Sequence, residues 1–132
     1  ISETELELLT GECDPETGGR LLLEKGIRLV LVTLGPHGCF YLSSAGSVYL
    51  PTYDTRVVDT TGAGDAFLGA ALFHISRLEK PLEEISREEM ERIVDFANAA
   101  GALCASKRGG IPAMPTCEEV ANCLLHVPKL II

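Results

Sequence analysis

The feature that most constrains this chain is a glycine-rich turn, Asp-Thr-Thr-Gly-Ala-Gly-Asp-Ala-Phe at positions 59–67, which follows two valines and leads into a helix-forming stretch. Gly62 and Gly64 can both adopt positive φ, so that successive backbone N–H groups can point toward one spot. The positive end of the following helix favours negative charge at the same spot. The turn therefore predicts an anion site at a helix N-terminus.

Asp65 lies where this predicted site meets the first helical turn. Its carboxylate would lie beside a bound anion, within reach of a hydroxyl that attacks the anion, and could accept the hydroxyl proton. The alternative is a plain helix cap, in which Asp65 accepts hydrogen bonds from the N–H groups of Ala66 and Phe67. The residues alone leave both interpretations open.

The composition narrows the classes of partner. The chain has 132 residues, of which 46% are hydrophobic, and its 19 acidic and 11 basic side chains give a net charge of −8. This charge disfavours nucleic acids and anionic membranes as partners. No apolar run approaches the roughly 20 residues that cross a bilayer, and no signal peptide opens the sequence. We therefore expect a cytoplasmic protein that binds neither nucleic acid nor membrane.

Alternating helix-like and strand-like segments predict an α/β fold. The continuous apolar run 29–34 has the length of a strand that is covered on both faces, as in parallel sheets. Two further strands, joined by a hairpin signal, are expected at 39–42 and 48–50. Helices are expected over residues 2–10, 15–25, 66–75, 86–108 and 116–127. The five cysteines form no Cys-x-x-Cys pair, which disfavours a disulfide framework or a zinc site.

Residues 59–67 resemble, without a break, the C-terminal signature of the ribokinase-like (PfkB) carbohydrate kinases. The resemblance implies a ribokinase-like fold of three α/β/α layers around a mainly parallel sheet. It also implies that the turn Gly62, Ala63 and Gly64 stabilises the transferred phosphoryl group, and that Asp65 is the base that deprotonates the sugar hydroxyl. These kinases are about twice as long as this chain. Residues 1–132 are therefore expected to be the C-terminal, nucleotide-binding and catalytic part, without the N-terminal sugar-binding half and its lid.

The same resemblance implies where ATP binds. Thr33 is expected at a phosphate, in a turn where Gly35 and Gly38 let the backbone approach the nucleotide. Asn98 is expected beside the adenine, and Gly109 lies in the loop that closes over the nucleotide. Each of these residues also has a structural alternative, because Gly-x-x-Gly is common in plain turns and Asn98 could be a surface residue of its helix.

Two cations are implied as well. Glu5 matches the acid of the family's Asn-x-x-Glu motif, which helps to place magnesium, although Ser2 replaces the asparagine and the pair also fits a capping box. A potassium ion would be surrounded by the Asp59 carboxylate and by backbone oxygens of Thr61, Cys104 and the loop from Gly109 to Ala113. Asp59 could instead form an ordinary Asx turn.

The resulting prediction is an ATP-dependent sugar kinase that uses Mg²⁺ and, in addition, K⁺. Segments 5–11 and 33–38 look most like fructokinases, so we expect fructose to be converted to fructose 6-phosphate. Ribokinase activity, 2-keto-3-deoxygluconate kinase activity and a non-catalytic nucleotide-binding module remain alternatives. An NAD-type oxidoreductase is disfavoured, because the third glycine of Gly-x-Gly-x-x-Gly is missing. Residues 1–132 alone are expected to be inactive, and the whole enzyme is expected to form a homodimer through the missing lid.

Overall fold

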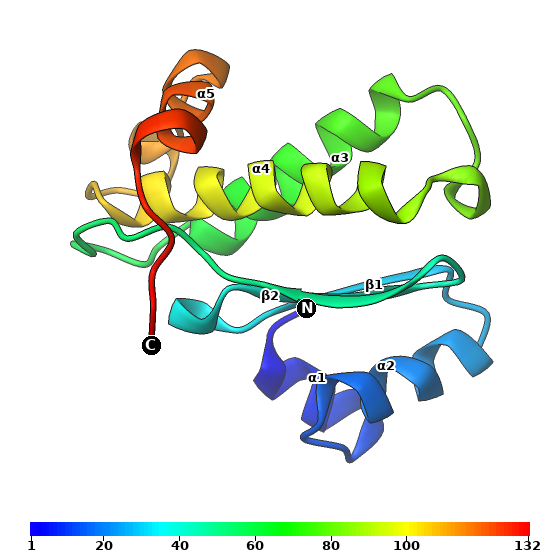
Figure 1. Cartoon of the computed structure of the whole chain (residues 1–132). Coiled ribbons are helices and arrows are strands. Elements are labelled where there is room, and N and C mark those ends of the chain that lie inside the picture. Colours follow the sequence, from blue (N-terminus) through cyan, green and yellow to red (C-terminus); the bar gives the residue numbers. More distant parts are fainter.

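The computed structural model describes all 132 residues and has three layers (Figure 1). Helices α1 and α2 cover one face of a small sheet, α3 and α4 cover the other, and α5 packs on α4. Three single-turn 3-10 helices lie in the connections: η1 (Gly35–His37), η2 (Leu82–Glu84) and η3 (Ile111–Ala113). The main elements are α1 (Glu3–Thr10), α2 (Pro15–Glu24), β1 (Leu29–Thr33), β2 (Cys39–Ser43), β3 (Gly46–Leu50), α3 (Ala63–Arg77), α4 (Arg87–Ala105) and α5 (Cys117–His126).

The sheet corrects one expectation from the sequence. Its order is β1-β2-β3 and both strand pairs are antiparallel, with Leu29 opposite Ser43 and Cys39 opposite Leu50. Parallel pairing needs a crossover of about a dozen residues or more, whereas these strands are joined by short turns. The one parallel pairing is a single bridge between Ser2 and Thr33, on the outer edge of β1. The expected mainly parallel sheet is therefore not formed by the strands of this chain.

The central position of β2 explains where the core lies. Every residue from Cys39 to Leu42 is buried, because β2 is covered on both faces. Phe40 and Leu42 face α1 and α2, while Tyr41 faces α3 and α4. Strand β1 was expected to be covered on both faces, but it lies at the sheet edge and alternates between buried and half-buried residues.

The first two helices begin as the sequence predicts. Ser2 and Glu5 form the capping box at α1: Glu5 N–H donates to Ser2 Oγ over 3.2 Å, and Ser2 N–H donates to Glu5 Oε2 over 2.7 Å. Gly11 ends α1 in the left-handed conformation. Asp14 caps α2 by accepting a hydrogen bond from the N–H of Thr17 over 2.8 Å. No helix of the chain combines the length and apolar character that a membrane crossing needs.

Two residues fix the end of β3 against the rest of the fold. Asn98 is buried in α4, and its Nδ2 donates to the carbonyl oxygens of Leu50 (3.2 Å) and Pro51 (3.3 Å). Gly38 has φ 89°, and a Cβ at this position would lie 2.0 Å from the Leu50 carbonyl oxygen. The turn after β1 can therefore approach the end of β3 only with glycine at position 38.

Substitution by alanine should change the stability in opposite directions at two glycines, because one is in close contact with the backbone and the other is not. Gly38→Ala should lower the free energy of unfolding by about 2–5 kcal/mol, from backbone strain and the clash with Leu50. Gly69→Ala, in the middle of α3 with no atom near the added Cβ, should raise it by roughly 0.5–1 kcal/mol. Chemical denaturation of the protein that carries this chain measures both changes. Equal stability of the two variants would contradict the packing described here.

Candidate functional site

The glycine turn forms the start of α3 and leaves backbone donors free. Gly62 is the N-cap residue, with φ 80° and ψ −3°, and no side chain caps the helix. The N–H of Ala63 donates to the Thr60 carbonyl (3.1 Å) and that of Ala66 to the Gly62 carbonyl (2.8 Å). The N–H groups of Gly64 and Asp65 have no acceptor in the protein. These two donors, at the positive end of a 15-residue helix, are an arrangement suited to an anion.

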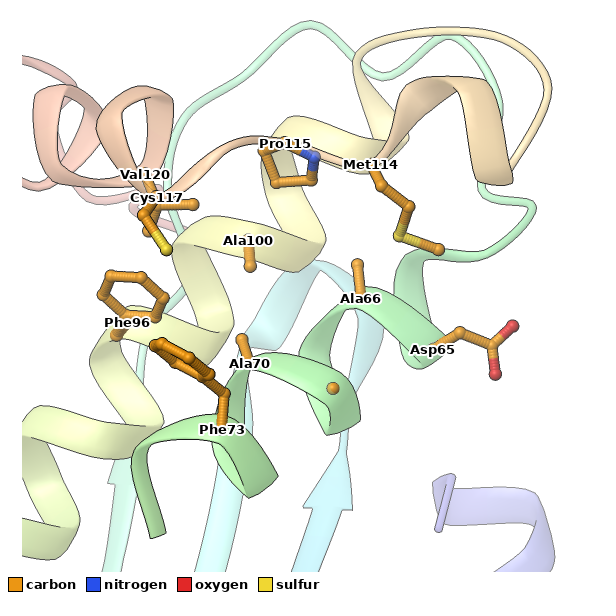
Figure 2. A pocket seen from close by; sticks show the side chains of 11 residues that line it. Asp65, Ala66, Ala70, Phe73, Phe96, Ala100, Met114, Pro115, Cys117 and Val120 are labelled. Atoms are coloured by element: carbon orange, nitrogen blue, oxygen red, sulfur yellow. The ribbon is translucent and has the colours of Figure 1, made fainter. Parts of the chain in front are cut away.

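Asp65 is the third residue of α3, and its exposed carboxylate makes no hydrogen bond within the chain. In Figure 2 this carboxylate points away from the apolar side chains that α3 and α4 bring together. Because Gly62 is the N-cap and no side chain caps the helix, the helix-cap interpretation of Asp65 is not supported. The structure thus leaves an unpaired carboxylate adjacent to the two free N–H donors.

Asp59 ties the glycine turn to the loop that follows α4. Its Oδ1 accepts a hydrogen bond from the N–H of Thr61 (3.0 Å), and its Oδ2 accepts one from the N–H of Gly109 (3.2 Å). The side chain and then the backbone N–H of Thr61, followed by the N–H of Gly109, hold the pKa of Asp59 below its ordinary value. The Asx turn expected as the alternative is present, and the second bond extends it across 50 residues.

The contact between the turn and this loop is close. The Cα of Gly110 lies 3.0 Å from the position that a Cβ on Gly62 would take. The Cys104 thiol lies between the two segments, donating to the carbonyl oxygens of Thr61 (3.8 Å) and Gly110 (3.9 Å), and Ala113 packs beside it. Burial, and then the charges of nearby Asp59 and Asp65, raise the pKa of the Cys104 thiol, which keeps it protonated.

These contacts bring the residues predicted to hold a monovalent cation into one place. Asp59, Thr61, Cys104, Gly109 and Ala113 all lie where the turn meets the loop. The donors here are one carboxylate and several carbonyl oxygens, the hard ligands that alkali cations accept. No group of three or more His, Cys, Asp or Glu side chains gathers anywhere in the chain. The donor set therefore fits a weakly held monovalent ion better than a zinc-type site.

A cavity of about 430 Å³ lies between η1, the start of α3 and the middle of α4. None of the 17 residues that line it carries a charged side chain. Several residues that were predicted to contact ATP or its phosphates meet there, from segments far apart in the sequence: Thr33, Gly35, Gly38, Ala63, Gly64 and Asn98. The structure also places Thr60, Gly101, Ala102 and Leu130 on the cavity wall, which the sequence did not suggest.

Gly62 and Asp65 of the glycine turn do not line this cavity, and neither do Gly109 and Glu5. Gly109 lies behind the glycine turn, where it binds Asp59. Glu5 stays in the capping box, in which hydrogen bonds from the backbone and then the side chain of Ser2 lower its pKa. Thr33 itself donates through Oγ1 to the Ile1 carbonyl (3.4 Å). Asn98 is only 4% exposed, so the alternative that it is a surface residue is wrong.

A smaller cavity of about 220 Å³ lies on the other side of α3 (Figure 2). Asp65 borders it, but the walls are apolar side chains such as Ala70, Phe73, Phe96 and Met114. Because 8 of its 11 lining residues are hydrophobic, the cavity does not suit a phosphate or a sugar. It is a packing groove between α3, α4 and the chain that enters α5.

Comparison with known proteins decides the family. The sequence model of a family described as "pfkB family carbohydrate kinase" matches residues 1–117. The chain belongs to the pfkB carbohydrate kinase family. The resemblance of residues 59–67 to the PfkB signature is thereby confirmed, and so is the ribokinase-like fold implied by it. The chain is superimposable on a ribokinase from Thermotoga maritima with a TM-score of 0.81 and 32% identity, over 95% of this chain and 41% of that one.

Fructokinases are prominent among the similar pfkB proteins. "Probable fructokinase-2" of Arabidopsis thaliana is 43% identical over 130 residues, which are 96% of this chain and 39% of that protein. Fructokinase from Vibrio cholerae O395, in a form with fructose, ADP and calcium ion bound, gives a TM-score of 0.83 and 32% identity, over 93% of this chain and 39% of that one. A double mutant of the Vibrio enzyme was solved with fructose, ADP and potassium ion bound; it gives a TM-score of 0.82 at 31% identity, over the same shares. The chain thus spans about two fifths of the length of these pfkB proteins.

The Asp59 contacts predict a pH-dependent contribution to stability. Because the folded-state pKa of Asp59 is depressed, its contribution is present above the unfolded pKa of about 3.9 and is lost as the pH falls through the folded pKa. The thermal midpoint of Asp59→Asn should therefore lie below that of the wild type at pH 7, and the gap should close below about pH 4. Asp54→Asn is the control, since the Asp54 carboxylate makes no ion pair. A gap that stays constant with pH would refute this account of Asp59.

Proposed function

We propose that this chain supplies the nucleotide-binding and catalytic part of an ATP-dependent sugar kinase, which transfers the γ-phosphoryl group of ATP to fructose O6. The observation that carries the proposal is the start of α3, where two unpaired N–H donors adjoin the unpaired Asp65 carboxylate beside a cavity of nucleotide-compatible size. The sugar contacts themselves would come from the part of the protein outside this chain.

Phosphoryl transfer needs positioning and charge stabilisation more than covalent chemistry. No charged side chain of this chain lines the cavity, so an anion there would meet backbone N–H groups of this chain and not a lysine or an arginine. The N–H groups of Gly64 and Asp65, together with the dipole of α3, are suited to stabilising negative charge on the γ-phosphoryl oxygens. Mg²⁺ bound with ATP would neutralise further phosphate charge, and Glu5 is the residue of this chain proposed to help place it.

Asp65 is proposed as the general base. As the sugar hydroxyl oxygen attacks the γ-phosphorus, its proton passes to the Asp65 carboxylate, the bond between Pγ and the bridging oxygen breaks, and ADP leaves. The lack of any hydrogen bond to this carboxylate within the chain leaves it available to the substrate. Thr33, Gly35 and Gly38 are proposed to contact the phosphates, and Asn98 to border the adenine while it holds β3.

Fructose is proposed as the acceptor because the similar proteins include plant and Vibrio fructokinases. Rates with fructose, ribose and 2-keto-3-deoxygluconate, measured on the whole enzyme, distinguish this assignment from its two alternatives. We also propose that the whole enzyme is cytoplasmic and forms a homodimer through the lid, which lies outside this chain.

Asp65→Asn tests the general base. The whole enzyme with this substitution should lose about 100- to 10,000-fold in kcat, because asparagine cannot accept the proton, while KM for ATP changes little. Its thermal midpoint should match the wild type, since Asp65 caps nothing. A fully active variant would contradict the mechanism. A wild-type enzyme that binds ATP but phosphorylates no sugar would instead favour the second candidate, a nucleotide-binding module without turnover.

The proposed potassium ion gives a separate test, which does not depend on turnover alone. Potassium should raise both the reaction rate and the thermal midpoint relative to sodium or a bulky organic cation, the midpoint by about a few degrees. Both effects should vanish in Asp59→Asn, which loses the carboxylate from the donor set. Identical rates and midpoints in all three salts would show that no such ion is bound.

A further inference from the structure

The segment that follows α5 forms one wall of the 430 Å³ cavity. It pairs with the chain after β3 in a short antiparallel bridge between Tyr53 and Lys129. The N–H of Asp54 donates to the Pro128 carbonyl (2.9 Å), and the N–H of Leu130 donates to the Thr52 carbonyl (2.9 Å). Figure 1 shows this segment, in red, crossing the connection that leaves β3. We call residues 128–130 the C-terminal strap.

Side chains clamp the strap in place. Asp95 Oδ1, on α4, accepts hydrogen bonds from the Tyr53 hydroxyl (2.9 Å) and from Lys129 Nζ. The same Nζ lies 3.7 Å from the centroid of the Tyr53 ring, a cation–π contact. Burial, and then the hydrogen bond to Asp95, raise the pKa of Tyr53, so that its hydroxyl stays a donor. The chain after β3, through Tyr53, and helix α4, through Asp95, thus fix the position of the strap.

The residue after this clamp, Leu130, is half-buried and lines the cavity. Gly64, which carries one of the two free N–H donors, lines the cavity at the start of α3, so we place the phosphates of a nucleotide at that wall. Leu130 and Ala102 instead give the cavity apolar surface. Such surface suits the ring of a base or the carbon face of a ribose.

On the basis of the proposed function, we infer that Leu130 is a binding residue that contacts the nucleoside part of the nucleotide, and that the clamp of Tyr53, Asp95 and Lys129 positions it. Nucleotide affinity would then depend on a residue that follows Asp65 by 65 positions in the sequence and yet lines the same cavity as Gly64. The strap takes no part in phosphoryl transfer.

Calorimetric titration of the whole protein with Mg-ATP, without sugar, tests this inference. Leu130→Ala should raise the Kd for ATP about tenfold, and Leu130→Val about threefold, by removing buried apolar carbon. AMP binding should weaken by the same factors, because the contact is to the nucleoside. The kcat at saturating ATP should stay unchanged. Leu125→Ala is the matched control, since Leu125 is exposed on α5 and does not line the cavity.

The outcomes separate this inference from the function on which it rests. A wild-type protein that binds ATP, with a folded Leu130→Ala or Leu130→Val variant that binds it equally well, overturns the role of Leu130 alone. A loss of affinity for ATP but not for AMP also overturns it, since the contact would then be to the phosphates. A wild-type protein that binds no ATP overturns the proposed function.

Discussion

The candidate site depends on one carboxylate that joins two distant segments. Asp59 accepts the N–H of Thr61 just before the glycine turn and the N–H of Gly109 after α4. With the carboxylate in place, Gly62 can lie against Gly110 and α3 can begin with an unpaired donor pair. Because the acceptor is a charged carboxylate, such bonds are stronger than those between neutral groups. The candidate anion site is therefore held in shape by the Asp59 carboxylate, whose own negative charge accepts hydrogen bonds from the backbone N–H groups of Thr61 and Gly109.

Backbone groups also explain how an acidic chain can suit an anion. The net charge of −8 opposes the approach of ATP, and the cavity offers no cationic side chain in return. Free N–H groups at a helix N-terminus act at short range and are fixed by the fold, so they need no mobile side chain to be ordered when the anion binds. Glycine at positions 62 and 64 keeps the approach to these donors open.

Local features of this fold could be predicted from the sequence, because neighbouring residues determine them. The capping box of Ser2 and Glu5 and the turn at Gly62 are set within a few positions of chain. The hairpin of β2 and β3 was predicted correctly, but β1 was wrongly expected to be a parallel strand. Its apolar run says only that the strand is largely covered, whereas the short turn that follows it carries the information on direction.

Contacts between residues far apart in the chain could not be predicted from the sequence for a different reason. Tyr53, Asp95 and Lys129 are ordinary surface-type residues that become a clamp only after α4 and the strap pack together. Leu130 likewise gives no local signal for a cavity wall. Family resemblance predicted Asn98 beside the nucleotide, and the structure places it on the wall of the 430 Å³ cavity. Its bonds to Leu50 and Pro51 could not be predicted, because they depend on the packing of α4 against β3.

The central claim, that the start of α3 is the phosphate site, can be tested most directly by backbone amide NMR of the whole protein. A non-hydrolysable ATP analogue with Mg²⁺ should shift the amide resonances of Gly64 and Asp65, because their N–H groups gain an acceptor. AMP, which lacks the γ-phosphoryl group, should bind in the cavity and leave these two resonances nearly unchanged. If the analogue binds and neither amide moves, the anion site lies elsewhere and the account is wrong.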